Sequence, residues 1–337
     1  MDGARSMEPA AAPVATRASR PLPAPPFLTV IVCTHERPRY LATCLAALEA
    51  GRAPNDAEAG VDWCVLVVDS ASTPAAAAEI ASLAAAYGVR LVRVKRPGLS
   101  LARNAGLAVT ATPWVAYIDD DACVDPGWAR AIAVCAARLP PGAAALGGPI
   151  LPAWEAPCPR WWPPELIPAL TVLSWSRPGR VGDGSLPRHV EPYGANMVFR
   201  TAALRDVGGF PPELGRIGRK LLSGEEAWVM RALRGAGHDI HYDPSIVVTH
   251  SIQAVRLTPH WLLRRQFWSG VSEAIVAARL AGKREALAKG ARMALHAALR
   301  APLALWPERH PGMIRQRCAL AFASGYLCGL CVVLLDP

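Results

Sequence analysis

Residues 114–121 read WVAYIDDD, and this stretch decides the fold. Its first five residues are apolar and predict a buried strand, which runs directly into Asp119, Asp120 and Asp121. A buried strand that leads into three consecutive acids is unfavourable unless a cation or hydrogen-bond donors neutralise the charge. Because Mg²⁺ and Mn²⁺ prefer oxygen ligands, the triplet predicts a cation site. A solvated acidic turn with a helix cap is the alternative, since an isolated Asp-x-Asp is a short motif.

Strands and helices alternate on the N-terminal side of this stretch. Short apolar runs typical of strands occupy 27–33, 63–68 and 89–94. Helical patterns separate them, from Pro38 onward and at 74–87 and 100–109. This alternation predicts an α/β fold with a mainly parallel sheet flanked by helices. Ligands of such sheets bind beyond the carboxyl ends of the strands, so the informative polar residues are Thr34, Glu36, Asp69, Ser70 and the triplet.

The pattern changes after the triplet. Asp125 and Pro126 predict the cap and the first residue of another helix. Residues 149–192 are rich in Pro and Trp and predict irregular structure. Regular patterns then return, as a strand with a short helix at 195–207, a helix at 223–233, a strand at 241–248 and helices from Thr258 onward.

Composition bounds the class of protein. The chain has 337 residues, of which 52% are hydrophobic, and this excludes a disulfide-built miniprotein and a disordered chain. Nine cysteines without regular spacing argue against a disulfide framework and predict a reducing compartment. Residues 1–26 are rich in Ala, Pro and Arg and contain no apolar core, so they predict a disordered leader and not a secretory signal. We therefore expect a cytoplasmic protein.

The C-terminal third carries much of the net charge of +9. Its Arg and Lys residues alternate with Ala and Leu, which is typical of amphipathic helices. Three partners fit that charged face: a membrane surface on the inner side of the membrane, a polyanionic acceptor, or solvent. Residues Cys318–Leu335 form an uncharged apolar run of 18, at the lower limit for a membrane span, so we expect a docked helix or an interfacial anchor. No nucleic-acid recognition motif is visible, and we expect no nucleic-acid partner.

Several segments together resemble a known enzyme family. They are TVIVCTHERPRYLATCL, VLVVDSAS, RPGLSLARNAGL and WVAYIDDDACVDPGW, followed by YGANMVFRTAALRDVGGF and LSGEEAWVMRALRGAGHDIHYDPSIVVTHSI. In this order they resemble a family 2 glycosyltransferase with the GT-A fold. The resemblance implies a nucleotide-sugar-binding half at 27–125 and an acceptor half at 126–252, which together form one domain, 27–252. The helical extension then covers 253–337.

The resemblance also implies residues for the donor and a metal ion. It implies Mn²⁺ or Mg²⁺ as cofactor, with Asp121, Asp119 and His250 as ligands, and Asp121 as the principal one. The residues implied for the nucleotide-sugar are Thr34, Glu36, Asp69, Arg103, Asn104, Asp119 and Asp120. Each has a purely structural alternative: a turn cap for Asp69, an ion pair with Asp119 or Asp121 for Arg103, and an ordinary hydrogen bond for His250.

The catalytic base implied by the resemblance lies at Glu225–Glu226. The family usually has Glu-Asp here with the second acid as base, so Glu226 is the first choice and Glu225 the second. The alternative is a capping box, because Ser223 precedes Glu226 by three residues. For the acceptor the resemblance implies Asn196. Aromatic stacking on a sugar adds Trp154, Trp161 and Trp162, with the pinning of a lid loop as the alternative. Trp228 is expected to form a wall of the acceptor site, with core packing as the alternative.

The resemblance therefore implies an inverting, metal-assisted glycosyltransferase. Its donor is a nucleoside-diphosphate sugar, and its acceptor is a hydroxyl on a cell-envelope polysaccharide, a glycolipid or a specialised small molecule. A nucleotidyltransferase is the first alternative, although CTHERPRY lacks the glycine-rich loop expected after the first strand. A non-catalytic sugar-binding relative is the second, and the acids at Asp119, Asp121 and Glu226 argue against it. A Rossmann dehydrogenase is disfavoured because no G-x-G-x-x-G follows the first strand.

Overall fold

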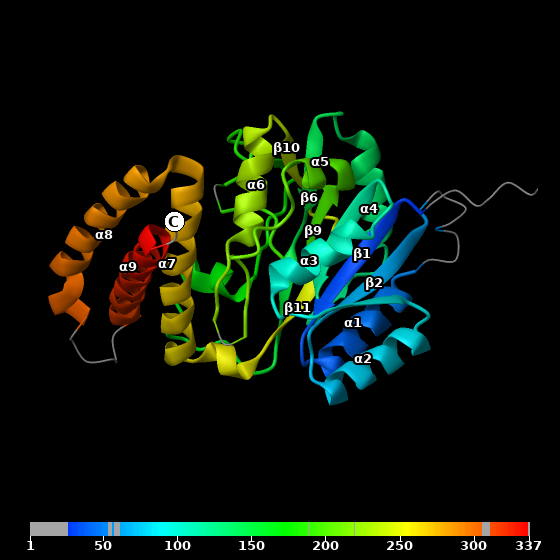
Figure 1. The fold of residues 1–337 in the computed structure, drawn as a ribbon, viewed down its shortest axis with the longest axis horizontal. Coiled ribbons are helices and arrows are strands. Elements are labelled where there is room, and N and C mark those ends of the chain that lie inside the picture. The colour runs from blue at the N-terminus through cyan, green and yellow to red at the C-terminus, as the bar shows by residue number, and fades with distance from the viewer. Residues whose placement is uncertain are drawn as a thin grey trace, which may run out of the picture.

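The computed structural model describes residues 26–52, 56, 61–187, 189–218, 220–304 and 311–335. The predicted leader, 1–26, lies outside the described residues except for Pro26. A large sheet forms the centre of the molecule, helices cover both of its faces, and a group of three long helices stands at one side (Figure 1). This arrangement confirms the α/β prediction and the helical C-terminal region.

The central sheet contains eight strands among the described residues, in the order β3-β2-β1-β4-β9-β6-β10-β8. The first four run parallel, as the buried apolar runs predicted. β9 is antiparallel to both of its neighbours, and β8 is antiparallel to β10. The bounds are β1 (Leu28–Thr34), β2 (Trp63–Ser70), β3 (Arg90–Val94), β4 (Trp114–Asp119), β6 (Ala143–Gly147), β8 (Gly179–Arg180), β9 (Met197–Arg200) and β10 (Asp239–Tyr242).

Helices bury their apolar sides on the two faces of this sheet. One face carries α1 (Pro38–Ala50), α2 (Pro74–Ala86) and α4 (Trp128–Arg138). The opposite face carries α3 (Leu99–Ala108), α5 (Thr201–Asp206) and α6 (Glu225–Gly235). The predicted apolar positions of α1 are all buried, namely Leu41, Cys44, Leu45 and Leu48.

A second, three-stranded sheet packs beside the first, in the order β5-β11-β7. It consists of β5 (Ala122–Val124), β11 (Val248–Ile252) and β7 (Ile150–Trp154). β4 of the large sheet ends at Asp119 and β5 begins at Ala122, so the aspartate triplet joins the two sheets. In the register of the small sheet, His250 lies opposite Ala122, which brings the histidine to the triplet.

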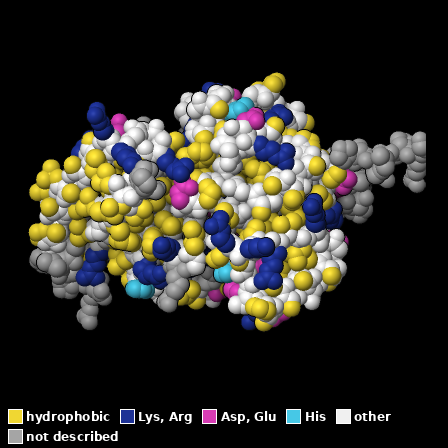
Figure 2. All heavy atoms as spheres, viewed as in Figure 1, with side chains coloured by type: hydrophobic (Ala, Val, Ile, Leu, Met, Phe, Trp, Pro, Cys, Tyr) yellow, Lys and Arg dark blue, Asp and Glu magenta, His cyan; other side chains and the backbone are white. Residues whose placement is uncertain are grey.

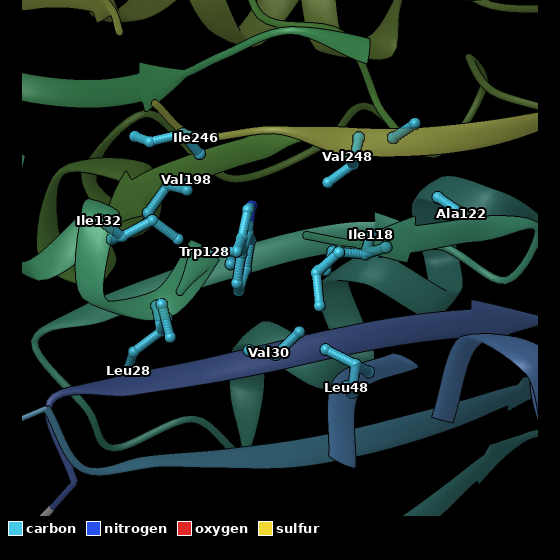
Figure 3. Close-up of a cluster of buried hydrophobic side chains, with 14 of the residues drawn as sticks. Leu28, Val30, Leu48, Ile118, Ala122, Trp128, Ile132, Val198, Ile246 and Val248 are labelled. Carbon is cyan, nitrogen blue, oxygen red and sulfur yellow. The ribbon is translucent and has the colours of Figure 1, made fainter. Parts of the chain in front are cut away.

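The core between the sheets centres on Trp128, the first residue of α4. Figure 3 shows its ring between Val30 and Ile118 on one side and Ile246 and Val248 on the other. The ring is 1% exposed, and its Nε1 donates a hydrogen bond to Asn196 Oδ1 at 3.1 Å. A buried indole N–H needs such a partner. This packing holds the small sheet against β4, and so fixes the strand ends that carry the triplet and His250.

Two predicted element boundaries are wrong. Asp125 and Pro126 do not begin a helix, because α4 starts at Trp128 after Gly127, whose φ of 79° breaks the pattern. Instead, the Asp125 carbonyl accepts a turn hydrogen bond from Trp128 N. The strand predicted at 241–248 is two strands, separated by a turn in which Asp243 Oδ1 accepts from Ser245 N at 2.9 Å.

Two short 3-10 helices pack against α7 (Pro259–Ala281): η1 (Pro164–Leu170), between β7 and β8, and η2 (Ala254–Leu257), which connects β11 to α7. Three long helices follow, α7 (Pro259–Ala281), α8 (Lys283–Ala304) and α9 (Pro311–Leu335). α9 packs closely on α7 because glycines on each helix lie against the backbone of the other helix. A Cβ on Gly325 would overlap the Phe267 carbonyl oxygen, and a Cβ on Gly270 would overlap that of Phe322.

α9 has the length and hydropathy of a membrane span. Its residues Gly312–Leu335 have a mean hydropathy of 2.2 over their most apolar window, and 33% of that window is buried inside the fold. Among the described residues, α9 is the one helix that is long and apolar enough to cross a membrane, judged by length and composition alone. Only a third of this window is buried, because α9 packs closely on α7 through one side and exposes apolar residues such as Val332 and Leu335 on the other.

Candidate functional site

A cavity of about 250 Å³ opens at the carboxyl ends of β1, β2 and β4. This is the edge where the parallel arrangement predicted a ligand. Thr34, Ser70 and Asp119 line it from the three strand ends, and Arg103 enters from α3. The opposite wall comes from the segment before α6, from the first turn of α6 and from α7. Its residues are Arg216, Gly218, Leu222, Ser223, Glu225, Glu226 and Arg265.

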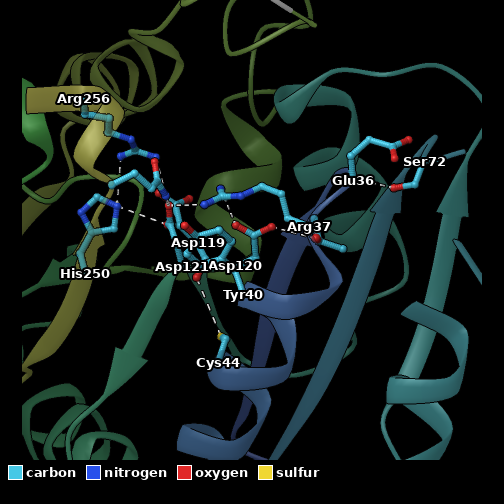
Figure 4. Close-up of polar contacts among 12 residues, drawn as sticks. Glu36, Arg37, Tyr40, Cys44, Ser72, Asp119, Asp120, Asp121, His250 and Arg256 are labelled. Carbon is cyan, nitrogen blue, oxygen red and sulfur yellow. Dashed lines mark hydrogen bonds and ion pairs between the residues drawn. The ribbon is translucent and has the colours of Figure 1, made fainter. Parts of the chain in front are cut away.

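The aspartate triplet is held by hydrogen bonds and ion pairs (Figure 4). Asp120 accepts from Thr34 Oγ1 at 2.8 Å and from Arg37 Nη1 at 2.8 Å. Arg37 also reaches Asp121 Oδ2 at 2.6 Å. Burial raises the pKa of Asp120 to about 7, although the Arg37 charge opposes that shift. The triplet is therefore a buried cluster with charged partners and not a solvated acidic turn.

Asp119, Asp121 and His250 offer ligand atoms that all lie within 4.8 Å of one another. His250 Nε2 is 3.2 Å from Asp121 Oδ1, and the histidine side chain is 1% exposed. His250 Nδ1 is buried without a hydrogen-bond partner. Two carboxylates and an imidazole are a donor set that suits Mn²⁺. The residues present therefore fit the divalent ion that the sequence predicted.

A second arginine, Arg256 of η2, contacts the same group. Its Nη2 donates to Asp121 Oδ2 at 3.0 Å, and its side chain is 7% exposed. Burial favours the neutral form of Asp121, but the His250 contact and the charges of Arg37 and Arg256 outweigh it, and the pKa of Asp121 lies well below its usual range. Asp121 is thus an anion that already has cationic partners on one oxygen and the imidazole on the other.

The two glutamates lie at the first turn of α6. The helix begins after Gly224, which has a φ of 91°, and it has no side-chain cap, so the alternative of a capping box by Ser223 and Glu226 is not realised. Arg103 Nη1 donates to Glu225 Oε1 at 2.8 Å, and Arg103 Nη2 is 3.4 Å from Asp119 Oδ1. Arg103 therefore connects the glutamate pair to the aspartate triplet from a position that is 2% exposed.

The environment separates the pKa values of the two glutamates. Burial, and then the charge of Glu226, raises the pKa of Glu225 to about 8. Burial also favours the neutral form of Glu226, but the Arg103 charge and the hydrogen bonds to the Glu226 carboxylate outweigh it, so the pKa of Glu226 is lowered. At neutral pH one carboxyl of the pair is thus a neutral acid and the other an ionised base.

This difference predicts how stability depends on pH. Glu225 has a folded-state pKa of about 8, above its ordinary value of 4.5. Between these two values the folded protein keeps a proton that the unfolded chain has released, so this group lowers stability as pH rises through the window. In Glu225→Gln that contribution is absent, and the melting temperature should fall less steeply from pH 5 to pH 8 than in the wild type. Parallel curves for the two proteins would contradict the assignment.

The residues predicted for the nucleoside form a group at the ends of β1 and β2. Asp69 is buried, accepts from Ser72 N at 3.0 Å and pairs with Arg93 at 3.1 Å. Glu36 has a φ of 59°, and its carboxylate accepts from the backbone and hydroxyl of Thr73. Both side chains lie outside the cavity lining, beside its β1–β2 end.

Asn104 and most of the predicted acceptor residues make hydrogen bonds or packing contacts within the fold. The Asn104 amide bonds to both the N–H and the carbonyl of Phe210. Asn196 is buried, and its amide donates to the carbonyls of Pro149 and Ile246. Trp162 is 5% exposed, Trp228 packs against the core, and Trp154 is 37% exposed at the end of β7. None of these five residues is among those lining the cavity in the described structure.

Four arginines of the site were not predicted from the sequence as site residues. Arg37, Arg216 and Arg265 line the cavity, and Arg256 contacts the triplet. Arg256 and Arg265 were assigned to the charged face of the C-terminal helices, and the structure corrects this: Arg256 is 5% exposed, and burial together with the charge of Arg216 lowers the pKa of Arg265. The sequence does carry one signal for Arg37: it lies in the loop after β1, at the strand end where ligands of such sheets bind.

Comparison with known proteins identifies the family. A family model described as Glycosyl transferase family 2 matches residues 29–146, which contain β1 to β4 and the triplet. An uncharacterized glycosyltransferase of Mycobacterium bovis is 32% identical over 192 residues, which are 55% of this chain and 75% of that protein. The chain is a family 2 glycosyltransferase. The triplet lies within the matched residues, whereas the glutamate pair lies C-terminal to them.

Two further similarities extend this result. The glucosyl-dolichyl phosphate glucuronosyltransferase of Haloferax volcanii is 31% identical over 186 residues, 53% of this glycosyltransferase and 56% of that protein. The glycosyltransferase chain thus spans little more than half the length of this relative. A mannosyltransferase from Pyrobaculum calidifontis, solved in complex with GDP-Man and Mn²⁺, superposes with a TM-score of 0.57 and 20% identity over 92% of this chain and 90% of that chain. It shares the GT-A fold.

Proposed function

We propose that this glycosyltransferase moves a sugar from a nucleoside-diphosphate sugar to an acceptor hydroxyl with inversion at the anomeric carbon. One observation carries the proposal: the ionised Glu226 and the acidic triplet line the same cavity, at the edge of the sheet where a ligand is expected. A single displacement requires a base for the acceptor and a cation-binding group for the departing diphosphate within one cavity.

The two walls of the cavity have different roles in this proposal. The strand ends bind the donor: Glu36 and Asp69 offer carboxylate acceptors to the nucleoside hydroxyls, beside Thr34 and Asp120. Asp119, Asp121 and His250 would hold a divalent ion, Mn²⁺ or Mg²⁺, which when bound stabilises the negative charge of the departing diphosphate. Arg37, Arg216 and Arg265 supply further positive charge around the same space.

The transfer step uses the glutamate pair. Glu226 takes the proton of the acceptor hydroxyl while the hydroxyl oxygen attacks the anomeric carbon, and the bond from that carbon to the diphosphate oxygen breaks. Arg103 holds Glu225 beside Glu226, and the neutral Glu225 leaves a single negative charge on the pair. The acceptor enters from the wall formed by Arg216, Leu222 and Arg265.

The acceptor and the cellular site are further parts of the proposal. Glycolipid, cell-envelope polysaccharide and specialised small-molecule acceptors all present a hydroxyl, and the relative from Haloferax volcanii is named for a dolichyl-phosphate-linked glucose. The exposed apolar residues of α8 and α9, together with their positive charge, support peripheral association with the inner face of a membrane. The nine free cysteines support a cytoplasmic location.

Donor and metal binding can be tested together by thermal unfolding. A ligand that binds only the folded state raises the melting temperature by mass action. We expect one nucleoside diphosphate to raise it in the presence of Mn²⁺ by several degrees more than the sum of the nucleotide and the ion alone. In Asp121→Asn, which keeps the shape of the side chain, that extra shift should disappear. If no nucleoside diphosphate or nucleotide-sugar gives a metal-dependent shift, the proposed donor site is wrong.

A further inference from the structure

A second concave site lies away from the transfer cavity. It is a groove of about 620 Å³ between α8 and α9, closed at its base by α7 and at one end by η1. Its walls are largely apolar and include Leu166, Met293, Leu320 and Phe322. Met293 and Leu320 are only partly covered in the folded chain, so this apolar surface remains open to a ligand.

The groove also carries positive charge along its edges. Lys289, Arg292 and His296 follow one another at helical spacing on α8, and Arg315 stands on α9. Glu165 is the one acid among the lining residues that the structure describes, and it already pairs with Arg315 at 2.5 Å. Lys289 pairs with Glu273. Arg292 makes no ion pair with any residue that the structure describes and is exposed.

The surroundings of the groove have the same amphiphilic character. Leu295 and Leu299 on α8 are 61% and 71% exposed, and Leu334 and Leu335 on α9 are 50% and 84% exposed. Figure 2 shows these helices as a broad apolar surface with Lys and Arg side chains scattered over it. Residues 283–335 contain eight Lys and Arg against two Glu, a net charge of +6 out of +9 for the chain. An apolar ligand with a negatively charged head matches both properties.

The geometry points to a binding site for a lipid that carries a phosphate headgroup, with the alkyl chain in the groove and the phosphate on Arg292. Guanidinium groups bind phosphate oxygens in a bidentate manner, and Lys289 on the same side of α8 adds a second positive charge. His296, one turn further along the same side, offers a ring nitrogen for a hydrogen bond. The site is separate from the transfer cavity, and α7 contributes a residue to each of them. Arg265 of α7 lines the cavity, and the next residue, Gln266, lines the groove.

Binding of a single-chain lipid phosphate to the full chain tests this site without any glycosyl transfer. The probes are dodecyl phosphate, dodecyl maltoside and inorganic phosphate, titrated calorimetrically below the micelle concentration of each amphiphile. We expect dodecyl phosphate to bind at least about tenfold more tightly than either of the others, because it satisfies the apolar wall and the cation together. In Arg292→Gln this advantage should shrink about tenfold, whereas dodecyl maltoside binding should not change.

Two further variants separate the groove from general surface charge. Arg284→Gln removes an exposed arginine of the same helix that does not line the groove, and it should leave the affinity for dodecyl phosphate unchanged. Ala319→Phe fills the groove and should abolish binding of both amphiphiles. Ala297→Leu on the facing helix serves the same purpose if the first variant is poorly folded.

The site is refuted if dodecyl phosphate binds no better than dodecyl maltoside, or if Arg284→Gln weakens binding as much as Arg292→Gln. It is also refuted if anionic vesicles bind the chain while dodecyl phosphate does not, since the surface would then dock on a bilayer without using the groove.

Discussion

Sugar transfer should fall by about a thousandfold when Glu226 is replaced by Gln, while the donor binds almost as well as before. The amide keeps the size of the side chain but cannot accept the proton of the acceptor hydroxyl. The reason for choosing Glu226 is electrostatic: Arg103 and hydrogen bonds keep its pKa low, so it is ionised at neutral pH. The measurement is kcat for transfer with a saturating donor, beside the donor affinity from calorimetry.

Glu225→Gln is the matched control, because it makes the same chemical change one residue earlier. Glu225 is a neutral acid at neutral pH, with a pKa of about 8, and an amide oxygen can still accept the hydrogen bond from Arg103. We expect this variant to retain transfer within about tenfold of the wild type, since no base is removed. If Glu225→Gln were inactive and Glu226→Gln active, the roles of the two glutamates would be reversed.

The second large effect concerns Arg103. Its guanidinium is 3% exposed and lies between Glu225 and Asp119, at 2.8 Å and 3.4 Å. Arg103→Met keeps much of the side-chain volume but removes the buried cation that faces the single negative charge of the glutamate pair. Removing one partner of a buried ion pair costs about 3–5 kcal/mol. Chemical unfolding should show this loss of stability, together with loss of transfer because Glu226 would no longer be held ionised.

The cost of Arg103→Met should itself depend on pH. Without the arginine the glutamate pair takes up protons more readily, so the destabilisation should be smaller at pH 5 than at pH 8. Arg180→Met is a matched control, because Arg180 also bridges two carboxylates, Asp183 and Asp239, but with its side chain 47% exposed. It should lose far less stability than Arg103→Met, because solvent screens exposed ion pairs. An equal loss in both variants would show that burial of Arg103 is not what makes its ion pairs important.

Much of the fold follows from local sequence patterns. Parallel strands buried on both faces are continuous apolar runs, and for this reason the predicted 27–33 and 63–68 match β1 and β2 closely. The helix from Pro38 was equally clear, because its apolar positions recur at helical spacing. The triplet at the end of β4 was visible because charged residues rarely follow a buried strand without a partner.

The small sheet could not be predicted in the same way. β5 has three residues, too few for any periodicity, and β7 lies in the stretch rich in Pro and Trp that predicted irregular structure. The arginine partners of the triplet were missed for a related reason. Arg256 contacts Asp121 across 135 residues of chain, and a local pattern of charged and apolar residues cannot distinguish such a buried arginine from a surface one.

The position of the triplet between two sheets has a mechanical consequence. Asp119 moves with the large sheet, because it ends β4, and Asp121 is tied to the small sheet, because its carbonyl accepts from Ser251 of β11. A ligand bound by both carboxylates therefore cross-links the two sheets and opposes their sliding past each other. Slower amide hydrogen exchange in β5 and β11 would accompany its binding, so the occupancy of the triplet is transmitted as rigidity along the small sheet.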